Sequence, residues 1–340
     1  MKKAIILFNL GGPDKPESVQ PFLFNLFNDP AIISLPSILR YPLAKLIAKR
    51  RTPIAKAIYS EIGGSSPILQ ETSLQAEAIE KSLASEKDHY KCFIVMRCWN
   101  PRAEETINKV KEFNPQQIIL LPLYPQYSAA TSGSSIKDWE ATCKAHEFNI
   151  DTKIICCYPT EISFIKSHAN LIKQKIKSEE KESTTIIFSA HGLPENKIKK
   201  GDPYQWQVEK SVEKLVDALL LKKSEYILSY QSRVGPLKWI GPSTDNVIVS
   251  ESKKNKKIIL VPIAFVSEHS ETLVELDIEY KKLATDNGCK EYVRIPALTC
   301  NEEFIDSLKK SILESGSHKK YTSSIMCPEK FKKCPRLMEI

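Results

Sequence analysis

The sequence contains no apolar run of the roughly 18 residues that a membrane-spanning helix needs, which argues against an integral membrane protein of that kind. The apolar stretch after Met1 breaks at once into glycine and proline at residues 11–13, with no small-residue cleavage site behind it. We therefore interpret this stretch as a first strand and not as a signal peptide. Zinc-finger spacing and the aromatic signature of RNA-binding domains are also missing, which counts against a nucleic-acid partner. We expect a cytoplasmic protein.

The chain has 340 residues, of which 42% are hydrophobic and 26% are charged. These fractions are ordinary for globular proteins, so they exclude a disordered or fibrous protein, and the length favours two domains. The formal net charge is +8, which favours an anionic partner without identifying it. Much of the excess lies in lysine-rich runs, which we interpret as solvated surface, at residues 197–200, 253–257 and 330–333.

The nine cysteines do not predict a disulfide framework, because their number is odd, the chain is long and no signal peptide is visible. We expect most of them to be buried, reduced thiols. Cys327 and Cys334 stand apart, because they lie in a polar tail beside two prolines.

Short apolar runs alternate with longer amphipathic segments along the whole chain. The runs do not alternate internally between apolar and polar residues, which is typical of buried parallel strands. The predicted strands are residues 4–8, 92–96, 117–121, 153–157, 185–189, 226–229, 258–263 and 292–295. The predicted helices are residues 70–85, 102–113, 161–178, 205–221 and 267–284. This order predicts a parallel α/β protein, either one barrel or two four-stranded open sheets.

A similarity between segments of the two halves of the sequence, an internal echo, favours two sheets. Residues 121–124 and 261–264 both end a strand at a proline and run toward a helix, and residues 8–13 and 188–194 both follow a strand with glycine and proline. These similarities are consistent with a duplicated doubly wound unit. Ligands of such sheets bind beyond the carboxyl ends of the strands, so the residues that follow each strand are the candidate site.

His191 follows a buried strand and precedes a glycine, which places an imidazole at the rim of the sheet. It is either a metal or proton ligand or a satisfied structural histidine. Glu271, Glu275 and Glu279 fall at i, i+4 and i+8 on the segment after another strand. This acidic face is either solvated surface or a path for hard cations or protons. His191 with Glu271 is a nitrogen and oxygen pair suited to ferrous iron or zinc.

Arg50 and Arg51 follow an unusually apolar segment at residues 22–47. Paired arginines can bind carboxylates or phosphates with two hydrogen bonds each. The apolar segment is either core or an exposed lip beside a cationic rim, which would suit an amphipathic ligand or a membrane surface.

Residues 124–128 and 133–135 combine aromatic residues, glycine and serine ahead of a predicted helix. Helix capping is the simpler interpretation of the serines, and anion binding is the alternative.

Taken in order, ten segments of the chain resemble the ferrochelatase family. The segments are residues 9–13 (NLGGP), 48–53 (AKRRTP), 62–67 (IGGSSP), 123–128 (LYPQYS), 131–135 (TSGSS), 189–194 (SAHGLP), 201–204 (GDPY), 230–236 (YQSRVGP), 239–242 (WIGP) and 262–280. Each motif is weakly specific, whereas their joint order over nearly the whole chain is very specific.

The resemblance implies two similar four-stranded, doubly wound, Rossmann-like chelatase domains with a porphyrin cleft between them. We expect an N-terminal domain at residues 1–150, a C-terminal domain at 151–301 and a short tail at 317–340. A helix at 302–316 is expected to pack back on the first domain.

The implied activity is that of a lyase that inserts ferrous iron into protoporphyrin IX, releasing two protons and forming protohaem in the last step of haem biosynthesis. The resemblance implies catalytic roles for His191, Glu271 and His269. It places His191 and Glu271 face to face across the porphyrin as metal ligands, and it makes Glu275 and Glu279 a metal or proton path. The implied porphyrin-binding residues are Leu10, Arg50, Arg51, Tyr59, Ser66, Arg97, Tyr124 and Trp239.

Some members of the family carry a [2Fe–2S] cluster held by one internal cysteine and three near the carboxyl end. Here the internal position is Ala129, and four thiolates are normally needed, so we predict no such cluster. The implied partners are protoporphyrin IX and Fe²⁺, with peripheral contact to the cytoplasmic face of the inner membrane and no nucleic acid. The chain would be a monomer or a homodimer. Iron insertion into coproporphyrin III and a non-catalytic haem or tetrapyrrole carrier are the alternatives.

Overall fold

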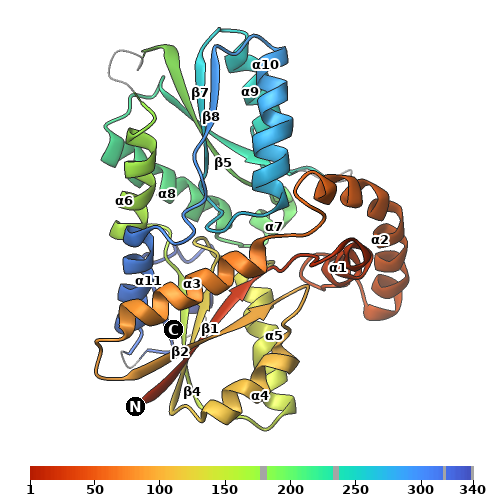
Figure 1. Cartoon of the computed structure of the whole chain (residues 1–340), viewed down its shortest axis with the longest axis vertical. Coiled ribbons are helices and arrows are strands. Elements are labelled where there is room, and N and C mark those ends of the chain that lie inside the picture. Colours follow the sequence, from red (N-terminus) through yellow and green to blue (C-terminus); the bar gives the residue numbers. More distant parts are fainter. Residues whose placement is uncertain (177–181, 233–236, 317–318, 338–340) are drawn as a thin grey trace. The chain divides into compact units, whose positions relative to one another are not determined.

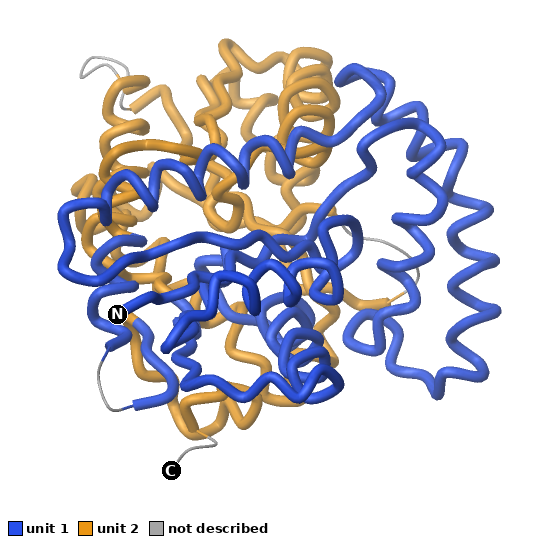
Figure 2. Tube along the Cα trace, turned by 60° about the horizontal axis from the view of Figure 1, so that its bottom comes forward, with its two compact units in different colours: residues 1–157, 308–323 blue, residues 158–307, 324–340 orange. Residues whose placement is uncertain are grey.

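The computed structural model describes residues 1–176, 182–232, 237–316 and 319–337. Within them the chain forms two compact units. The first comprises Met1–Cys157 and Leu308–Ser323, and the second comprises Tyr158–Ser307 and Ser324–Ile340 (Figure 2).

The first unit contains a parallel sheet with the strand order β2-β1-β3-β4-β9. Its strands are β1 (Lys2–Asn9), β2 (His89–Met96), β3 (Gln117–Pro122), β4 (Asp151–Cys157) and β9 (Tyr321–Ser323). Its helices are α1 (Val19–Phe27), α2 (Ser37–Ser60), α3 (Ile68–Leu83), α4 (Ala103–Phe113) and α5 (Ser132–Ala145). Side chains of alternate strand residues point to opposite faces, so the continuous apolar runs of β1 and β3 require helices on both faces.

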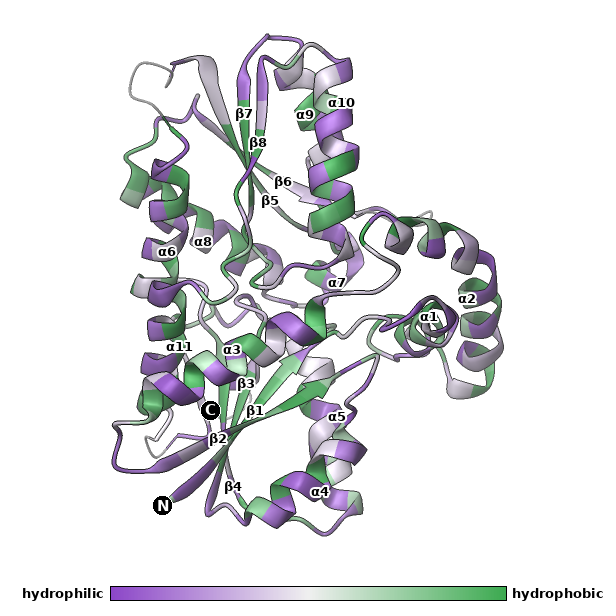
Figure 3. Ribbon diagram, in the orientation of Figure 1, coloured by the Kyte–Doolittle hydropathy of each residue, from purple (hydrophilic) through white to green (hydrophobic). Residues whose placement is uncertain are grey.

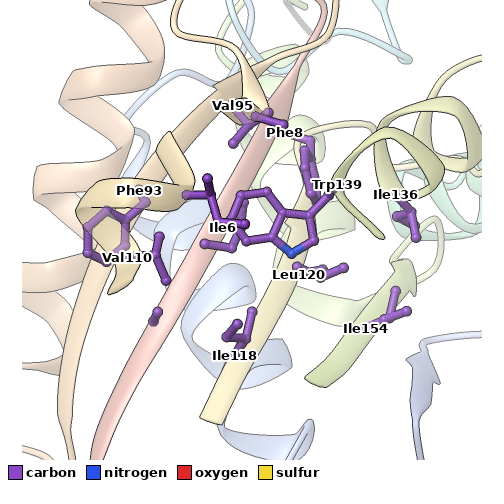
Figure 4. Close-up of a cluster of buried hydrophobic side chains, with 13 residues drawn as sticks. Ile6, Phe8, Phe93, Val95, Val110, Ile118, Leu120, Ile136, Trp139 and Ile154 are labelled. Carbon is purple, nitrogen blue, oxygen red and sulfur yellow. The ribbon is translucent and has the colours of Figure 1, made fainter. Parts of the chain in front are cut away.

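One face of this sheet packs on α4 and α5 around Trp139, which is 1% exposed (Figure 4). Ile6 and Phe8 of β1 and Leu120 of β3 supply the strand side of this core, and Ile107 of α4 supplies part of the helix side. The helix α3 contacts β1 and β2 (Figure 1).

The second unit contains a parallel sheet with the order β6-β5-β7-β8. Its strands are β5 (Thr184–His191), β6 (Tyr226–Gln231), β7 (Lys257–Pro262) and β8 (Glu291–Arg294). Its helices are α6 (Ile162–Lys173), α7 (Glu195–Lys199), α8 (Tyr204–Leu219), α9 (Thr244–Ser252), a π-helix (Glu271–Glu279) and α10 (Tyr280–Asp286). The helices α6 and α8 lie on the opposite side of this sheet from α9 and α10 (Figure 1). Hydrophobic residues concentrate along the central strands of both sheets (Figure 3).

The two sheets confirm the predicted doubly wound α/β class and repeat one topology. Phe8 of β1 pairs with Pro122 of β3, and Ser189 of β5 pairs with Pro262 of β7. In each case the residue after the proline donates its amide to the paired strand, over 2.8 Å to Phe8 O and 3.0 Å to Ser189 O. The echo seen in the sequence therefore marks equivalent positions of the two sheets.

The compact units do not divide where the sequence-based boundaries fall. A boundary after residue 150 would separate β4 from β3, with which it pairs over four residues. The helix α11 (Glu302–Glu314) begins in the second unit and ends in the first. The proposed tail is not detached either, because β9 adds a short fifth strand beside β4 and residues 324–337 belong to the second unit.

Some sequence predictions fall on residues outside the described part of the chain. These are residues 177–181 of an expected helix end and loop, 233–236 of the motif at 230–236, and 317–318 and 338–340 of the expected tail. Within the described residues, no helix is both long and apolar enough to cross a membrane.

Candidate functional site

The strongest candidate site lies at the carboxyl end of β5, where His191 meets the first residue of the π-helix. The His191 Nδ1 and Glu271 Oε2 atoms are 2.9 Å apart, and both side chains are about one-third exposed. The strand ends in the order Ser189, Ala190, His191, and only the histidine is partly exposed. It still pairs with Gln231 of β6, whereas the pairing with β7 ends at Ser189. The sheet thus presents an imidazole at its rim, as the sequence predicted.

Each member of this pair changes the protonation of the other. Burial alone would lower the pKa of His191, but the charge and hydrogen bond of Glu271 outweigh it and raise that pKa. Burial would raise the pKa of Glu271, but the charge of His191 and the hydrogen bond lower it to about 2. The pair therefore rests as imidazolium and carboxylate, and the two groups titrate together.

Glu275 joins the pair through Ser232. The Ser232 hydroxyl lies 3.1 Å from Glu271 Oε2 and 2.5 Å from Glu275 Oε2, and the Ser232 amide donates to Glu275 Oε1 over 3.1 Å. Tyr280 donates a further hydrogen bond of 2.8 Å to Glu275 Oε1. Burial and the charge of Glu271 raise the pKa of Glu275, so this carboxyl holds a proton more readily than an ordinary glutamate.

Ser232 was not among the predicted site residues, although it directly follows β6 at the rim of the sheet. Its φ angle is +59°, in the left-handed region that non-glycine residues rarely adopt. This conformation aims both its amide and its hydroxyl at the carboxylates of the π-helix. Strain of this kind at a rim position is typical of functional sites.

His269 supports the beginning of the π-helix. Its Nδ1 atom accepts the amide of Glu271 over 3.0 Å, which leaves the ring proton on Nε2. Burial lowers the pKa of His269, which keeps the ring neutral. Its ring also packs edge-on against Phe265, with centroids 4.6 Å apart, and Phe265 in turn packs against the His191 ring.

The π-helix corrects the expected geometry of the acidic face. Glu271 and Glu275 converge on one serine, whereas Glu279 is exposed and lies outside this cluster. The resemblance implies that His191 and Glu271 lie on opposite sides of a porphyrin. In this structure their side chains are joined by a 2.9 Å hydrogen bond.

A second polar cluster lies in the first unit around Arg97. Its guanidinium bonds Asp29 Oδ2 over 3.1 Å and Ser134 Oγ over 2.8 Å, and the Ser134 hydroxyl donates to Asp29. Asp138 completes the set at 3.5 Å. The serines at 132–135 therefore lie within the first turn of α5 and not ahead of it, and Thr131 makes no side-chain cap. Ser134 orients an arginine instead, a role that the capping interpretation missed.

The other predicted porphyrin-binding residues of the first unit are spread over several elements. Tyr124 follows β3, and burial raises the pKa of its phenol, which stays neutral. Tyr59 is buried in an apolar cluster that Leu10 packs against. Arg51 lies over the Phe27 ring at 5.9 Å, while Arg50 is exposed on α2.

Ser66 approaches the glycine-rich loop after β1. A methyl group at Gly12 would lie 2.4 Å from the Ser66 Cβ atom, so only glycine allows this approach. The Ser66 amide donates to Pro13 O over 2.7 Å. Ser66 and Gly12 also line a groove of about 1140 Å³ that runs along β2, α3 and α4. In the second unit, Trp239 pairs with Pro194 in a single antiparallel bridge just after His191.

Comparison with solved structures identifies the class of fold. The structure of SirB from Bacillus subtilis with Fe³⁺ matches with a TM-score of 0.57 and 13% identity, over 93% of this chain and 96% of SirB. A sirohydrochlorin chelatase SirB in complex with cobalt matches with a TM-score of 0.54. The fold is that of the chelatases.

Sequence comparison identifies the family. The family described as Ferrochelatase matches residues 2–315. A ferrochelatase of Pelagibacter ubique is 62% identical over 99% of both chains, and one of Rickettsia bellii is 50% identical over 97% of this chain and 94% of its own. A ferrochelatase of Caulobacter vibrioides is 49% identical over 98% of this chain and 97% of its own. The chain belongs to the ferrochelatase family.

Proposed function

We propose that the chain inserts ferrous iron into protoporphyrin IX, with His191, Glu271 and Glu275 as the groups that handle the metal and the protons. The family makes it a lyase of haem biosynthesis, and iron is its substrate. The observation that carries the residue assignment is the chain of contacts from His191 through Glu271 and Ser232 to Glu275.

This arrangement suits the binding of Fe²⁺ and its release to the porphyrin. Fe²⁺ binds a neutral imidazole and an ionised carboxylate, so His191 must give up its proton before it can bind the metal. Glu271 is already ionised, because its pKa is lowered to about 2 by His191. One nitrogen and one oxygen ligand form a sparse site, which can release iron to the porphyrin.

The same contacts suit the removal of protons from the porphyrin. Protoporphyrin carries two N–H protons, and both leave when the metal enters. Glu275 has a raised pKa and shares Ser232 with Glu271. A proton that reaches the pair can therefore move through the serine hydroxyl to Glu275, where Tyr280 steadies the carboxyl.

Side chains of the first unit are proposed to contact the macrocycle and its carboxylates. Arg97 is held in place by Asp29 and Ser134, and Tyr124 offers a neutral phenol. Arg50 and Arg51 are suited to the propionates, because guanidinium groups bind carboxylates with two hydrogen bonds.

An insertion assay with two porphyrins tests this proposal. Anaerobic insertion of Fe²⁺ into protoporphyrin IX should proceed with a higher kcat/KM than insertion into coproporphyrin III. His191→Ala and Glu271→Gln should each lower kcat/KM by about 100-fold, the size of effect typical for a lost proton-transfer group. The surface variants His146→Ala and Glu209→Gln serve as matched controls and should stay fully active. Full activity of both site variants would refute the site, and a preference for coproporphyrin would refute the substrate.

We also propose that α2 makes a peripheral contact with the cytoplasmic face of the inner membrane. Ile38 is 84% exposed, Ile54 is 63% exposed and Leu39 is 57% exposed on this helix. Lysine and arginine residues lie among them, and Figure 3 shows the mixture of hydrophobic and hydrophilic residues along α2. An apolar surface bordered by cations suits an anionic lipid surface.

The proposal includes no resident [2Fe–2S] cluster. Ala129 cannot supply a thiolate, and Cys327 and Cys334 are buried beside Phe331. Iron and sulfide analysis of anaerobically purified protein should find neither in stoichiometric amount. A stoichiometric [2Fe–2S] absorption spectrum would contradict this expectation.

A further inference from the structure

The C-terminal segment of the second unit, residues 324–337, packs against the elements that surround His191. Cys327, Phe331 and Cys334 are at most 7% exposed and form an apolar cluster with Trp206 and Leu337. We call residues 324–337 the C-terminal latch. A polar, lysine-rich segment buries such side chains only where it packs on another surface of the protein.

The latch packs on the turn before α8 and on the first turn of that helix. The Trp206 and Phe331 rings lie 5.5 Å apart, and Gln207 Nε2 donates to Cys327 Sγ over 3.3 Å. The Lys333 amide donates to Gly201 O over 3.1 Å. Gly201 has a φ angle of +87°, and a methyl group there would lie 2.9 Å from the Lys332 amide nitrogen. The latch thus touches the Gly201 turn at backbone distance.

The same helical turn holds the backbone of His191. The buried Tyr204 is the first residue of α8, and its hydroxyl donates to His191 O over 3.0 Å. The Tyr204 amide in turn donates to the buried Asp202 carboxylate over 3.1 Å. Burial raises the pKa of Tyr204 well above its usual range, so its hydroxyl always has a proton to donate.

The hydrogen bond from Tyr204 replaces one that the sheet cannot supply. Two residues earlier, Ser189 O accepts the amide of Ile263, which directly follows β7. Carbonyls of alternate residues point to the same side of a strand, so His191 O points beyond the end of β7. Tyr204 therefore supports the backbone of the last residue of β5 at a carbonyl that lies past the paired part of β7.

We propose that Tyr204 is a positioning residue for His191 and that the C-terminal latch holds Tyr204 in place through the Gly201 turn and Trp206. The latch is then part of the support of the catalytic histidine, although it contacts neither iron nor porphyrin. Its importance for turnover rests on the proposed function, whereas its effect on the His191 ring does not.

Two pairs of matched variants test the two steps. Tyr204→Phe removes the hydroxyl that bonds His191, and its control is Tyr230→Phe, which removes a buried hydroxyl without a hydrogen-bond partner among the described residues. Gly201→Ala pushes the latch away. Its control is Gly288→Ala, which has the same backbone strain at φ +83° but a nearest neighbour at 3.9 Å.

The first measurement is the NMR signal of the His191 ring in protein labelled with ¹⁵N-histidine, assigned by its loss in His191→Ala. The signal should shift in Tyr204→Phe and in Gly201→Ala and stay unchanged in both controls. An unchanged His191 signal in Tyr204→Phe overturns the positioning role. An unchanged signal in folded Gly201→Ala overturns the role of the latch.

The second measurement is iron insertion into protoporphyrin IX. Tyr204→Phe and Gly201→Ala should lower kcat by about fivefold, the effect of one lost hydrogen bond, with the porphyrin KM unchanged. Both controls should keep the wild-type kcat. Gly288→Ala should do so although the strained backbone lowers its Tm, as it does in Gly201→Ala. A wild-type kcat in Tyr204→Phe would overturn the proposal. If the His191 signal shifts as expected but the wild-type protein inserts no iron, the proposed function fails and the positioning role stands.

Discussion

His191 and Glu271 share one hydrogen bond, and that contact sets the charge of the proposed metal site before any metal binds. The carboxylate raises the pKa of the imidazole against the effect of burial. In the proposed metal site, iron and a proton would therefore compete for the His191 imidazole. The competition favours the proton at low pH and the metal above the raised pKa of His191.

Glu271→Gln should lower the pKa of His191, because the variant removes the negative charge while burial continues to disfavour the imidazolium. NMR titration of the His191 ring in iron-free protein measures this change directly. Glu279→Gln is the control, since Glu279 is exposed and outside the cluster, and it should leave the titration unchanged. A His191 pKa that stays the same in Glu271→Gln would show that the carboxylate does not set it.

A second histidine makes the fold sensitive to acid. His168 of α6 is fully buried, its ring nitrogens have no hydrogen-bond partner among the described residues, and burial lowers its pKa to about 3. The unfolded chain takes up a proton at this residue near pH 6.5, but the folded chain does not until about pH 3. The free energy of unfolding should therefore fall by about 1.4 kcal/mol for each pH unit below 6.5.

His168→Leu should remove this contribution, which urea unfolding at pH 7 and pH 5 can measure. The loss of stability between the two pH values should shrink by about 2 kcal/mol, which corresponds to 1.5 pH units of titration. The same substitution at the exposed His89 should not change it. An equal loss in wild type and His168→Leu would contradict the prediction.

At the scale of the element, the π-helix decides which carboxylates act together. Its wider turn is rare and is often found at functional sites. Here it begins at Glu271, directly after a turn that His269 stabilises through the Glu271 amide. Glu271 and Glu275 then reach Ser232 from one helix, so two carboxylates of opposite pKa shift share one hydroxyl.

The exposed apolar side chains of α2 lead to a prediction about lipid binding. Ile38→Glu combined with Ile54→Glu should lower binding to vesicles of phosphatidylcholine and phosphatidylglycerol by about 100-fold or more, because burying one isoleucine contributes roughly 1.5–3 kcal/mol and the variant loses two of them. Co-sedimentation measures the bound fraction. Ile162→Glu is the control, since Ile162 is 81% exposed on α6, and it should bind as wild type does. Unchanged binding of the α2 variant would contradict the membrane contact.

At the scale of the whole molecule, one topology occurs twice but the histidine occurs once. The strand register makes Leu10 of the first unit equivalent to His191 of the second. Leu10 packs against the apolar cluster that contains Tyr59, whereas His191 meets Glu271. The two sheets therefore carry residues with different surroundings at the same rim position.

This difference predicts that a histidine cannot simply be moved to the other unit. The double variant His191→Ala, Leu10→His should insert iron no faster than His191→Ala, because the new imidazole would lie among apolar side chains. The insertion assay with protoporphyrin measures both. Recovery of activity in the double variant would show that the two rims are interchangeable.

The sequence by itself determined the parallel α/β class, the two sheets and the position of His191 at a strand end. These features depend on the period of apolar residues and on the glycines and prolines that follow each strand, which are local properties. The ordered motifs also predicted the family. They named His191, Glu271 and Glu275, which the structure brings together, and Glu279, which it does not.

Only the tertiary structure decided how these residues meet. Ser232 joins the two carboxylates, Tyr204 bonds the histidine carbonyl, and residues 321–323 complete a sheet that begins at residue 2. His191 and Glu271 are 80 residues apart in sequence, and their contact depends on where β5 and β7 end in the same sheet. No local pattern encodes such a contact, because it arises from the packing of segments that are distant along the chain.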